Sequence, residues 1–326
     1  MKTLVERFPQ QLQEALDIAN QAVLTKKSNV NNILITGLGG SGIGGTILSE
    51  LIQTECPIPV LVNKDYFLPK YVNSNTLVII SSYSGNTEET VSAMQQAITK
   101  KAQVVCITSG GKVKELADQN NFDTIIIPGG KPPRSCIGYS LVQLLKVIQF
   151  NGFAKTDLLS QVSSSILLLN NENTSIKNEA TQIAKLLVNK IAVIYSLGSC
   201  EGVAVRFRQQ LNENSKMLCW HHTFPEMNHN ELVGWTEKNE NLAVVTFKTS
   251  FDYTRTQKRY EICKTLFAKF SSSVTDITAK GNNKLEEYFY LINIGDWISC
   301  YIADLKNIDP IEVDVITNLK NELAKI

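Results

Sequence analysis

The sequence predicts an α/β fold with two similar halves, each a mainly parallel sheet flanked by helices. Short runs rich in Ile, Val, Leu and Thr alternate with helical stretches, and this alternation is typical of a parallel sheet. The runs are apolar on both faces, as expected for strands that are covered by helices on each side. A third observation extends the fold to the whole chain, because the pattern of strand, small-residue loop and helix begins again after residue 188.

Five strands are expected in the first half. Each is a short run of apolar and β-branched residues that ends in Gly, Ser or Asn, residue types that favour turns. The runs lie within residues 31–40, 58–66, 75–85, 102–111 and 123–130, and helices are expected between them at 44–53 and 87–101.

The second half opens with a helical stretch near residues 155–188. KIAVIYSLGSCEGVAVRF, residues 190–207, then repeats the strand, loop and helix of the first half. Further strands are expected within 241–250 and 272–281, and the last stretch is expected to be helical from Pro310 to the C-terminus. The boundary between the halves is placed within residues 151–159, which gives domains of residues 1–153 and 154–326.

Composition bounds the class of protein. The 326 residues allow about two domains of ~150 residues, and the net charge of +1 gives no sign of a nucleic-acid groove. No stretch approaches the ~18 apolar residues of a membrane span, and the N-terminus lacks the apolar core of a signal peptide. The seven scattered cysteines contain no C-x-x-C pair, which indicates reduced thiols in a cytoplasmic protein.

The first candidate loop is ILITGLGGSGIGG, residues 33–45, with six glycines in thirteen residues. A tight turn needs fewer, so the loop is predicted to approach a ligand closely. Gly37, Gly39 and Gly42 have the G-x-G-x-x-G spacing of dinucleotide-binding proteins, and Asp65 follows the second strand. An NAD-dependent oxidoreductase therefore remains an alternative at this point.

The second candidate loop follows the third expected strand. NTLVIISSYSGNTEET places Ser82, Ser84 and Thr87 just before a helix begins. Hydroxyls and free backbone N–H groups at a helix N-terminus suit an anion, and parallel sheets bind ligands at the carboxyl ends of their strands. Helix capping by Ser84 or Thr87 is the simpler interpretation, but a cap needs only one hydroxyl.

Glu213 stands near the end of a predicted helix, in RFRQQLNENSK. The negative end of a helix dipole favours a protonated carboxyl group, which suits a base that takes and returns a proton near neutral pH. Arg134 follows two prolines that fix the backbone before it. From placement alone, a solvated surface residue is the simpler interpretation of the Glu, whereas the prolines favour a fixed role for the Arg.

Six motifs in order give the chain a family resemblance. SSYSGNTEET looks like the phosphate-binding signature of the SIS (sugar isomerase) fold. GLGGSGIGG, PGGKPPRSCIGYS, LNENSK, PEMNHNELVGW and a Lys near the C-terminus are similar to one branch, the bifunctional phosphoglucose/phosphomannose isomerases. The resemblance covers about residues 30–320. It implies two SIS-type doubly wound domains and an aldose–ketose isomerase that interconverts glucose 6-phosphate and mannose 6-phosphate with fructose 6-phosphate.

The resemblance also implies roles for individual residues. Arg134 would stabilise the negative charge of a cis-enediolate, and Glu213 would move a proton between C1 and C2 of the sugar. His229 would open the sugar ring from the neighbouring subunit of a homodimer, with help from Lys320, for which Lys306 is the substitute candidate. The phosphate would be bound by the two loops, at Gly40, Ser41, Ser82, Ser84 and Thr87.

Two points stay open at this stage: the use of mannose 6-phosphate, and alternative functions within the fold. Relatives often have Asp-Pro-Thr-Pro-Val where this chain has Asp309-Pro310-Ile311-Glu312-Val313, and the missing Thr bears on the use of mannose 6-phosphate. His221, His222 and His229 cluster without the spacing of a zinc site, so no metal site is expected. The proton transfer that the resemblance implies requires no cofactor. A non-catalytic sugar-phosphate-binding protein and an isomerase of amino-sugar phosphates remain alternatives.

Overall fold

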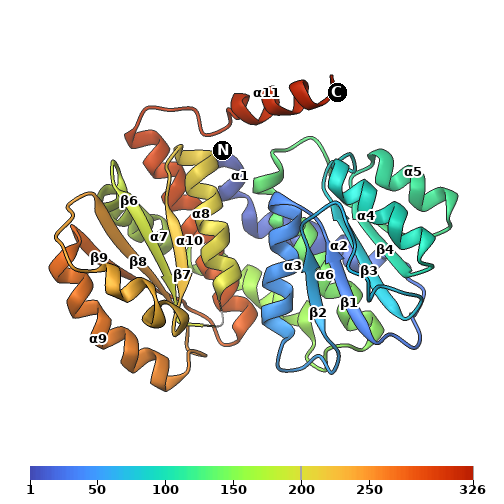
Figure 1. Cartoon of the computed structure of the whole chain (residues 1–326), viewed down its shortest axis with the longest axis horizontal. Coiled ribbons are helices and arrows are strands. Elements are labelled where there is room, and N and C mark those ends of the chain that lie inside the picture. The colour runs from blue at the N-terminus through green and yellow to red at the C-terminus, as the bar shows by residue number, and fades with distance from the viewer. Residues whose placement is uncertain (199, 326) are drawn as a thin grey trace.

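The computed structural model describes residues 1–198 and 200–325 and contains two parallel sheets with a layer of helices between them (Figure 1). The predicted α/β class is confirmed. The first sheet has the order β2-β1-β3-β4-β5 and the second has the order β7-β6-β8-β9, with every neighbouring pair parallel.

The first sheet is covered by helices on both faces because its strands are apolar on both faces. Ile33 and Ile35 of β1 belong to the core that includes α2, α3 and α6, while Leu34 belongs to the core under α4 and α5. The elements are α1 (Lys2–Glu6), α2 (Phe8–Gln21), β1 (Asn32–Thr36), α3 (Gly39–Ile52), β2 (Val60–Asn63), β3 (Thr76–Ser82), α4 (Glu88–Thr99), β4 (Gln103–Thr108), α5 (Gly111–Gln119), β5 (Asp123–Ile126) and α6 (Ile137–Asn151).

The second sheet repeats this design with fewer strands. Val193 and Val244 pack with residues of α9, and Ile194 and Val245 point to the opposite core, which includes α8 and α10. The elements are α7 (Leu158–Leu187), β6 (Ile191–Ser196), α8 (Glu201–Ser215), β7 (Trp220–Thr223), β8 (Leu242–Lys248), α9 (Thr254–Phe270), β9 (Ser273–Thr278), α10 (Lys284–Leu305) and α11 (Asp314–Leu323).

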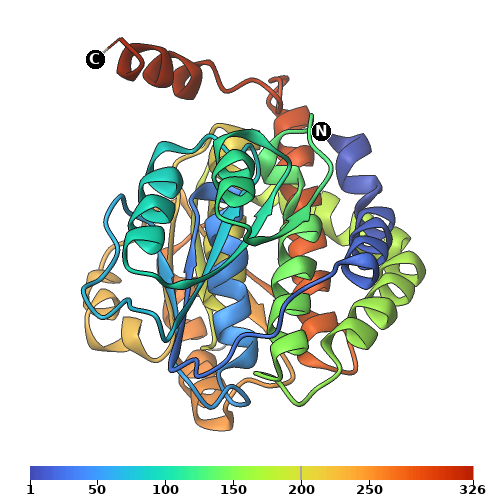
Figure 2. The same cartoon turned by 90° about the vertical axis from the view of Figure 1, so that its right-hand side faces the viewer.

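Among the strands and the C-terminal helix, the structure differs from the expectation at two elements. β7 was not expected, because WHHT is a short, polar edge strand without an apolar run. The C-terminal helix begins at Asp314 rather than at Pro310, because the carbonyl groups of Pro310 and Ile311 bind a side chain of another segment instead of continuing a helix. Figures 1 and 2 show α11 projecting from the body of the molecule, and none of its described residues is buried.

The two halves meet where α3 packs against α8. The helices are antiparallel, since Glu50 near the end of α3 accepts hydrogen bonds from the backbone N–H of Gly202 near the start of α8, at 2.8 and 3.0 Å. A Cβ at Gly202 would lie 2.9 Å from Cγ1 of Ile47 and 3.2 Å from its backbone nitrogen. Glycine is therefore required for this close approach.

This contact predicts a pH dependence of stability. Burial raises the pKa of the half-buried Glu50 to about 8, and the Gly202 N–H, Lys284 and Lys64 oppose this shift while Glu201 adds to it. The folded state then binds more protons than the unfolded state between about pH 5 and pH 8, so the free energy of unfolding falls as pH rises through this window. We expect a loss on the order of 1–3 kcal/mol.

Glu50→Gln keeps an acceptor for the Gly202 N–H and removes the titration. Urea denaturation from pH 5 to pH 9 should therefore show a flatter dependence for this variant than for the natural protein. Glu55→Gln is the matched control, because the Thr156 hydroxyl and backbone N–H lower the pKa of Glu55 below this range. Equal pH dependence in the natural protein and Glu50→Gln would contradict the assignment.

Candidate active site

Two loops at the carboxyl edge of the first sheet touch each other. Ser41 Oγ accepts a hydrogen bond from the backbone N–H of Tyr83 at 3.1 Å. A Cβ at Gly37 would lie 2.4 Å from the carbonyl oxygen of Ser81, so the glycine allows the first loop to pass close to the second. The glycine loop and the serine loop therefore form one region.

The helices that start at these loops have no side-chain cap at their N-termini. Neither Leu38, the N-cap of α3, nor Thr87, the N-cap of α4, makes a side-chain capping bond. Ser82 Oγ lies 3.3 Å from Thr87 Oγ1, and Ser84 is exposed. The hydroxyls do not cap α4 here, and uncapped N–H groups beside several hydroxyls are suited to binding an anion.

Arg134 lies next to the glycine loop. It is part of a short 3₁₀ helix, Pro133–Ser135, and its side chain is only 5% exposed. A Cβ at Gly40 would lie 3.0 Å from the carbonyl oxygen of Pro133. The predicted charge-stabilising residue is thus buried beside the predicted phosphate loops.

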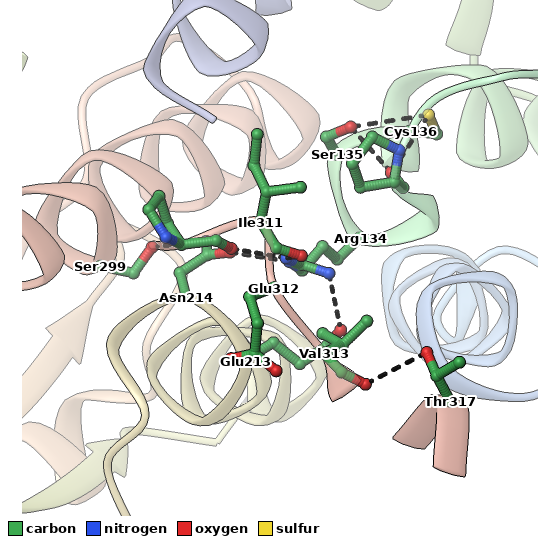
Figure 3. A network of polar contacts seen from close by, with 12 residues as sticks. Arg134, Ser135, Cys136, Glu213, Asn214, Ser299, Ile311, Glu312, Val313 and Thr317 are labelled. Atoms are coloured by element: carbon green, nitrogen blue, oxygen red, sulfur yellow. Dashed lines mark hydrogen bonds and ion pairs between the residues drawn. The ribbon is translucent and has the colours of Figure 1, made fainter. Parts of the chain in front are cut away.

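The guanidinium group of Arg134 joins three segments that are distant in sequence (Figure 3). Nη1 lies 3.2 Å from Oε2 of Glu213, and Nε donates to Oδ1 of Asn214 at 2.7 Å. Nη2 donates to the carbonyl oxygens of Pro310 and Ile311, at 2.5 and 3.0 Å. The structure therefore brings Arg134 and Glu213 together and adds the C-terminal segment 310–313 as a third wall.

A cavity of about 310 Å³ lies between the end of α8 and this segment. Glu213, whose side chain is 31% exposed, is one of its walls. The other lining residues are Asn212, Lys216, Glu312, Val313, Val315 and Ile316. A half-exposed carboxylate paired with a buried Arg at the mouth of a small cavity is suited to proton transfer on a bound polar ligand.

Asn214 and Lys216 were not among the predicted site residues, although both lie in the LNENSK motif. Lys216 has a left-handed backbone, with φ of 51°, and Nζ donates to the carbonyl oxygens of Glu213 at 2.6 Å and Glu312 at 2.7 Å. Burial, and also the charge of Arg134, lowers the pKa of Lys216. This lysine links the end of α8 to the C-terminal segment.

His229 does not lie near Glu213 within one chain. It follows β7 at the carboxyl edge of the second sheet, where α8 begins, whereas Glu213 is in the last turn of α8 (Figure 1). A helix of 15 residues is about 22 Å long. His229 is exposed at that far end.

The two lysine candidates also differ in position. Lys320 is exposed on α11 and does not line the cavity beside Glu213. Lys306 Nζ donates to the carbonyl oxygens of Ser215 and Lys216, at 2.8 and 3.3 Å, and so caps the end of α8.

The matching loops of the second sheet are occupied by the protein's own carboxylates. Glu50 accepts from the Gly202 N–H at the start of α8, and Glu287 accepts from the Ser250 N–H after β8, at 3.0 and 3.3 Å. Asp252 accepts from the Thr249 N–H at 2.7 Å. Among the residues that the structure describes, the loops after β1 and β3 of the first sheet have no carboxylate that accepts from their backbone N–H groups.

The other predicted features have ordinary surroundings. His222 Nδ1 accepts from the Thr223 N–H, and His221 lies 3.6 Å from Glu201. Asp65 is exposed and accepts from the Tyr66 N–H. Within residues 1–198 and 200–325, no group of three His, Cys, Asp or Glu side chains is arranged to hold a metal ion, and no helix is long and apolar enough to cross a membrane.

Comparison with known proteins identifies the family. Residues 176–323 match the bacterial phospho-glucose isomerase C-terminal SIS domain, and residues 26–132 match the SIS domain. The chain is 41% identical to the bifunctional phosphoglucose/phosphomannose isomerase of Caldicellulosiruptor bescii, over 99% of this chain and 98% of that one. The chain belongs to this isomerase family. The relative of the same name from Thermoplasma acidophilum is 37% identical over 90% of both chains.

The likeness extends to solved structures of the SIS fold. The C-terminal domain of glucosamine-fructose-6-phosphate aminotransferase from Francisella tularensis superposes with a TM-score of 0.75 at 14% identity, over 95% of this chain and 97% of that one. Tagatose-6-phosphate ketose/aldose isomerase from Escherichia coli gives a TM-score of 0.70 at 15% identity, over 94% and 93%. These structures confirm the predicted fold class, and the family confirms the resemblance carried by the six motifs.

Proposed function

We propose that this protein interconverts glucose 6-phosphate and mannose 6-phosphate with fructose 6-phosphate. It is a sugar-phosphate aldose–ketose isomerase by family. The observation that carries the proposal is the contact between Arg134 and Glu213, 3.2 Å apart, near the glycine loop and the hydroxyl-rich serine loop, whose helices have no side-chain cap at the N-terminus. The closeness of these candidate phosphate-binding and proton-transfer groups supports the proposal, because a hexose 6-phosphate needs both.

The phosphate is bound by the first domain in this proposal. A phosphate dianion needs several donors in a small concavity. Gly40 and Ser41 at the start of α3, and Ser82, Ser84 and Thr87 before α4, offer backbone N–H and hydroxyl donors. The contact between the two loops supports their acting on one phosphoryl group.

The chemistry is a proton transfer between neighbouring carbons. Once the ring is open, Glu213 takes a proton from one carbon and returns it to the other through a cis-enediol. Arg134 stabilises the charge that develops on the enediolate oxygen, since its cation is buried and fixed before the reaction starts. Such a transfer oxidises one carbon and reduces its neighbour, so it needs no external redox cofactor.

Ring opening is assigned to His229 and Lys320, and the protein is proposed to act as a homodimer. The distance between His229 and Glu213 along α8 supports a role for His229 in the site of a neighbouring subunit. α11 carries Lys320 together with Val315, Leu319 and Leu323, three exposed apolar side chains that suit a contact with a neighbouring subunit. Domains of residues 1–153 and 154–326 and a cytoplasmic location complete the proposal, supported by the segment between α6 and α7 and by seven free cysteines.

A coupled assay tests the function. Purified protein should convert glucose 6-phosphate and mannose 6-phosphate, and a chelator should not change either rate. Glucosamine 6-phosphate is the third substrate, because a D-glucosamine-6-phosphate 4-epimerase of Sulfolobus acidocaldarius is 29% identical over 74% of this chain. Activity confined to the amino sugar, or saturable NAD binding, would contradict the proposal.

A specific activity that falls on dilution is expected for a dimer with a shared site.

A further inference from the structure

We propose that a buried polar cluster between α8 and α10 positions Arg134 for catalysis. The cluster consists of Arg206, Gln210 and Asn214 on α8 and Asp296 and Ser299 on α10. This inference rests on the proposed function, because it assigns positioning residues to the charge-stabilising Arg134. Asn214 lies in the LNENSK motif, and the other four residues lie outside the six motifs.

The cluster lies in the contact between α8 and α10, where Ser215 Oγ also donates to the Ser299 carbonyl oxygen at 2.8 Å. Arg206, Gln210 and Asn214 follow one another at intervals of four, so they share one face of α8, and Asp296 and Ser299 share one face of α10. All five residues are 5% exposed or less. Their neighbours on α10 include Ile292, Ile298 and Cys300, which are also buried.

The first half of the cluster fixes the backbone of Arg134. Arg206 Nη2 donates to the Arg134 carbonyl oxygen at 3.1 Å. The same nitrogen donates to both oxygens of Asp296, at 2.9 and 2.6 Å, and Gln210 Nε2 donates to Asp296 at 2.6 Å. Burial raises the pKa of Asp296, and the Arg206 cation opposes this shift.

The second half fixes the guanidinium group. Asn214 Oδ1 accepts from Arg134 Nε at 2.7 Å, which requires the amide to be oriented with its oxygen toward the Arg. Asn214 Nδ2 donates to Ser299 Oγ at 3.0 Å, and this bond sets that orientation (Figure 3). Ser299 Oγ in turn donates to the Asp296 carbonyl oxygen at 2.7 Å, which links the two halves.

A contribution to folding stability does not explain why this helix contact contains a buried ion pair. A buried ion pair seldom stabilises more than apolar residues of similar volume would, because both charges must be desolvated. Breaking one partner is strongly destabilising, so single variants mix folding with function. Replacing both charges by apolar groups separates the two roles, since the contact remains packed while the bond to Arg134 is lost.

The test is therefore the double variant Arg206→Met/Asp296→Leu, assayed with fructose 6-phosphate. We expect a folded protein with a melting temperature near or above that of the natural chain, and a kcat about 10- to 100-fold lower, as a small misplacement of a catalytic group produces. KM should stay within about threefold, because the phosphate loops are untouched.

Lys27→Met/Asp123→Leu is the matched control. This ion pair is also largely buried, with side chains 13% and 15% exposed and an Nζ to Oδ2 distance of 2.7 Å. Asp123 starts β5, so it lies at the edge of the first sheet opposite the phosphate loops. Loss of this ion pair in the control variant should leave kcat within about twofold of the value of the natural protein.

Arg134→Lys is measured alongside, so that two failures are distinguished. If Arg134→Lys lowers kcat and the folded double variant does not, the positioning role is wrong and the proposed function stands. If Arg134→Lys itself keeps full kcat, the role of Arg134 in the proposed function is wrong, and the inference falls with it. Should the double variant not fold, Asn214→Leu and Ser299→Ala carry the same test, with lowered kcat at constant KM expected and unchanged kcat overturning the proposal.

Discussion

Glu213→Gln is expected to lower kcat for isomerisation of fructose 6-phosphate by about a hundredfold or more, with KM within about threefold of the natural value. The amide keeps the shape of the carboxylate and its oxygen still accepts from Arg134 Nη1, so the site stays assembled. It does not accept the carbon-bound proton, which removes the base from the reaction.

A carboxylate in the same cavity gives the control for this variant. Glu312 lines the cavity and lies 3.8 Å from Lys216, and Glu312→Gln should change kcat by only a few-fold. Exchange of the sugar's transferred proton with deuterium oxide, followed by NMR, provides a second readout that should disappear only in Glu213→Gln. A fully active Glu213→Gln enzyme would show that another group is the base.

Arg134→Lys is expected to lower kcat by about a hundredfold, although the charge is retained. The guanidinium reaches Glu213, Asn214 and the carbonyl groups of the C-terminal segment at the same time, whereas an ammonium group presents a single nitrogen. The lysine would leave at least one of these buried partners without its donor, and the cation would move away from the developing enediolate.

Arg208→Lys is the matched control, because Arg208 is on the same helix as Glu213 and its charge acts on His221, at a distance from Arg134. This variant should retain kcat within about twofold. Equal kcat losses in the two variants would indicate a general effect of weakened Arg contacts and contradict a specific role for Arg134.

The sequence was informative wherever local pattern determines structure. All eight expected strands are present, because uninterrupted runs such as residues 76–82 bury both faces of the sheet. β7 was not predicted, because an edge strand can be short and needs no apolar run. The start of α11 was misplaced because Pro310 resembles a helix-initiating residue, and its actual role as an acceptor for Arg134 is a long-range contact.

In the candidate site, too, local features could be predicted from the sequence and long-range contacts could not. The glycine and serine loops were predicted from composition, since their glycines, their hydroxyls and their position before a helix are local features of the sequence. The meeting of Arg134 with Glu213 and Asn214, about eighty positions apart, depends on how α3 packs on α8 and has no local signature. Tertiary packing also determines where the internal carboxylates of the second sheet lie and why Arg206 and Asp296 are buried. A polar residue in a predicted helix gives no sign of either.

A crystal structure with bound fructose 6-phosphate tests the central claim most directly. The phosphoryl group is expected at the glycine and serine loops, within hydrogen-bond distance of Ser41 and Ser84. C1 and C2 should lie about 3 Å from a carboxylate oxygen of Glu213, close enough for proton transfer. A phosphoryl group at the carboxyl edge of the second sheet, or a sugar whose first two carbons lie away from Glu213, would contradict the proposed site.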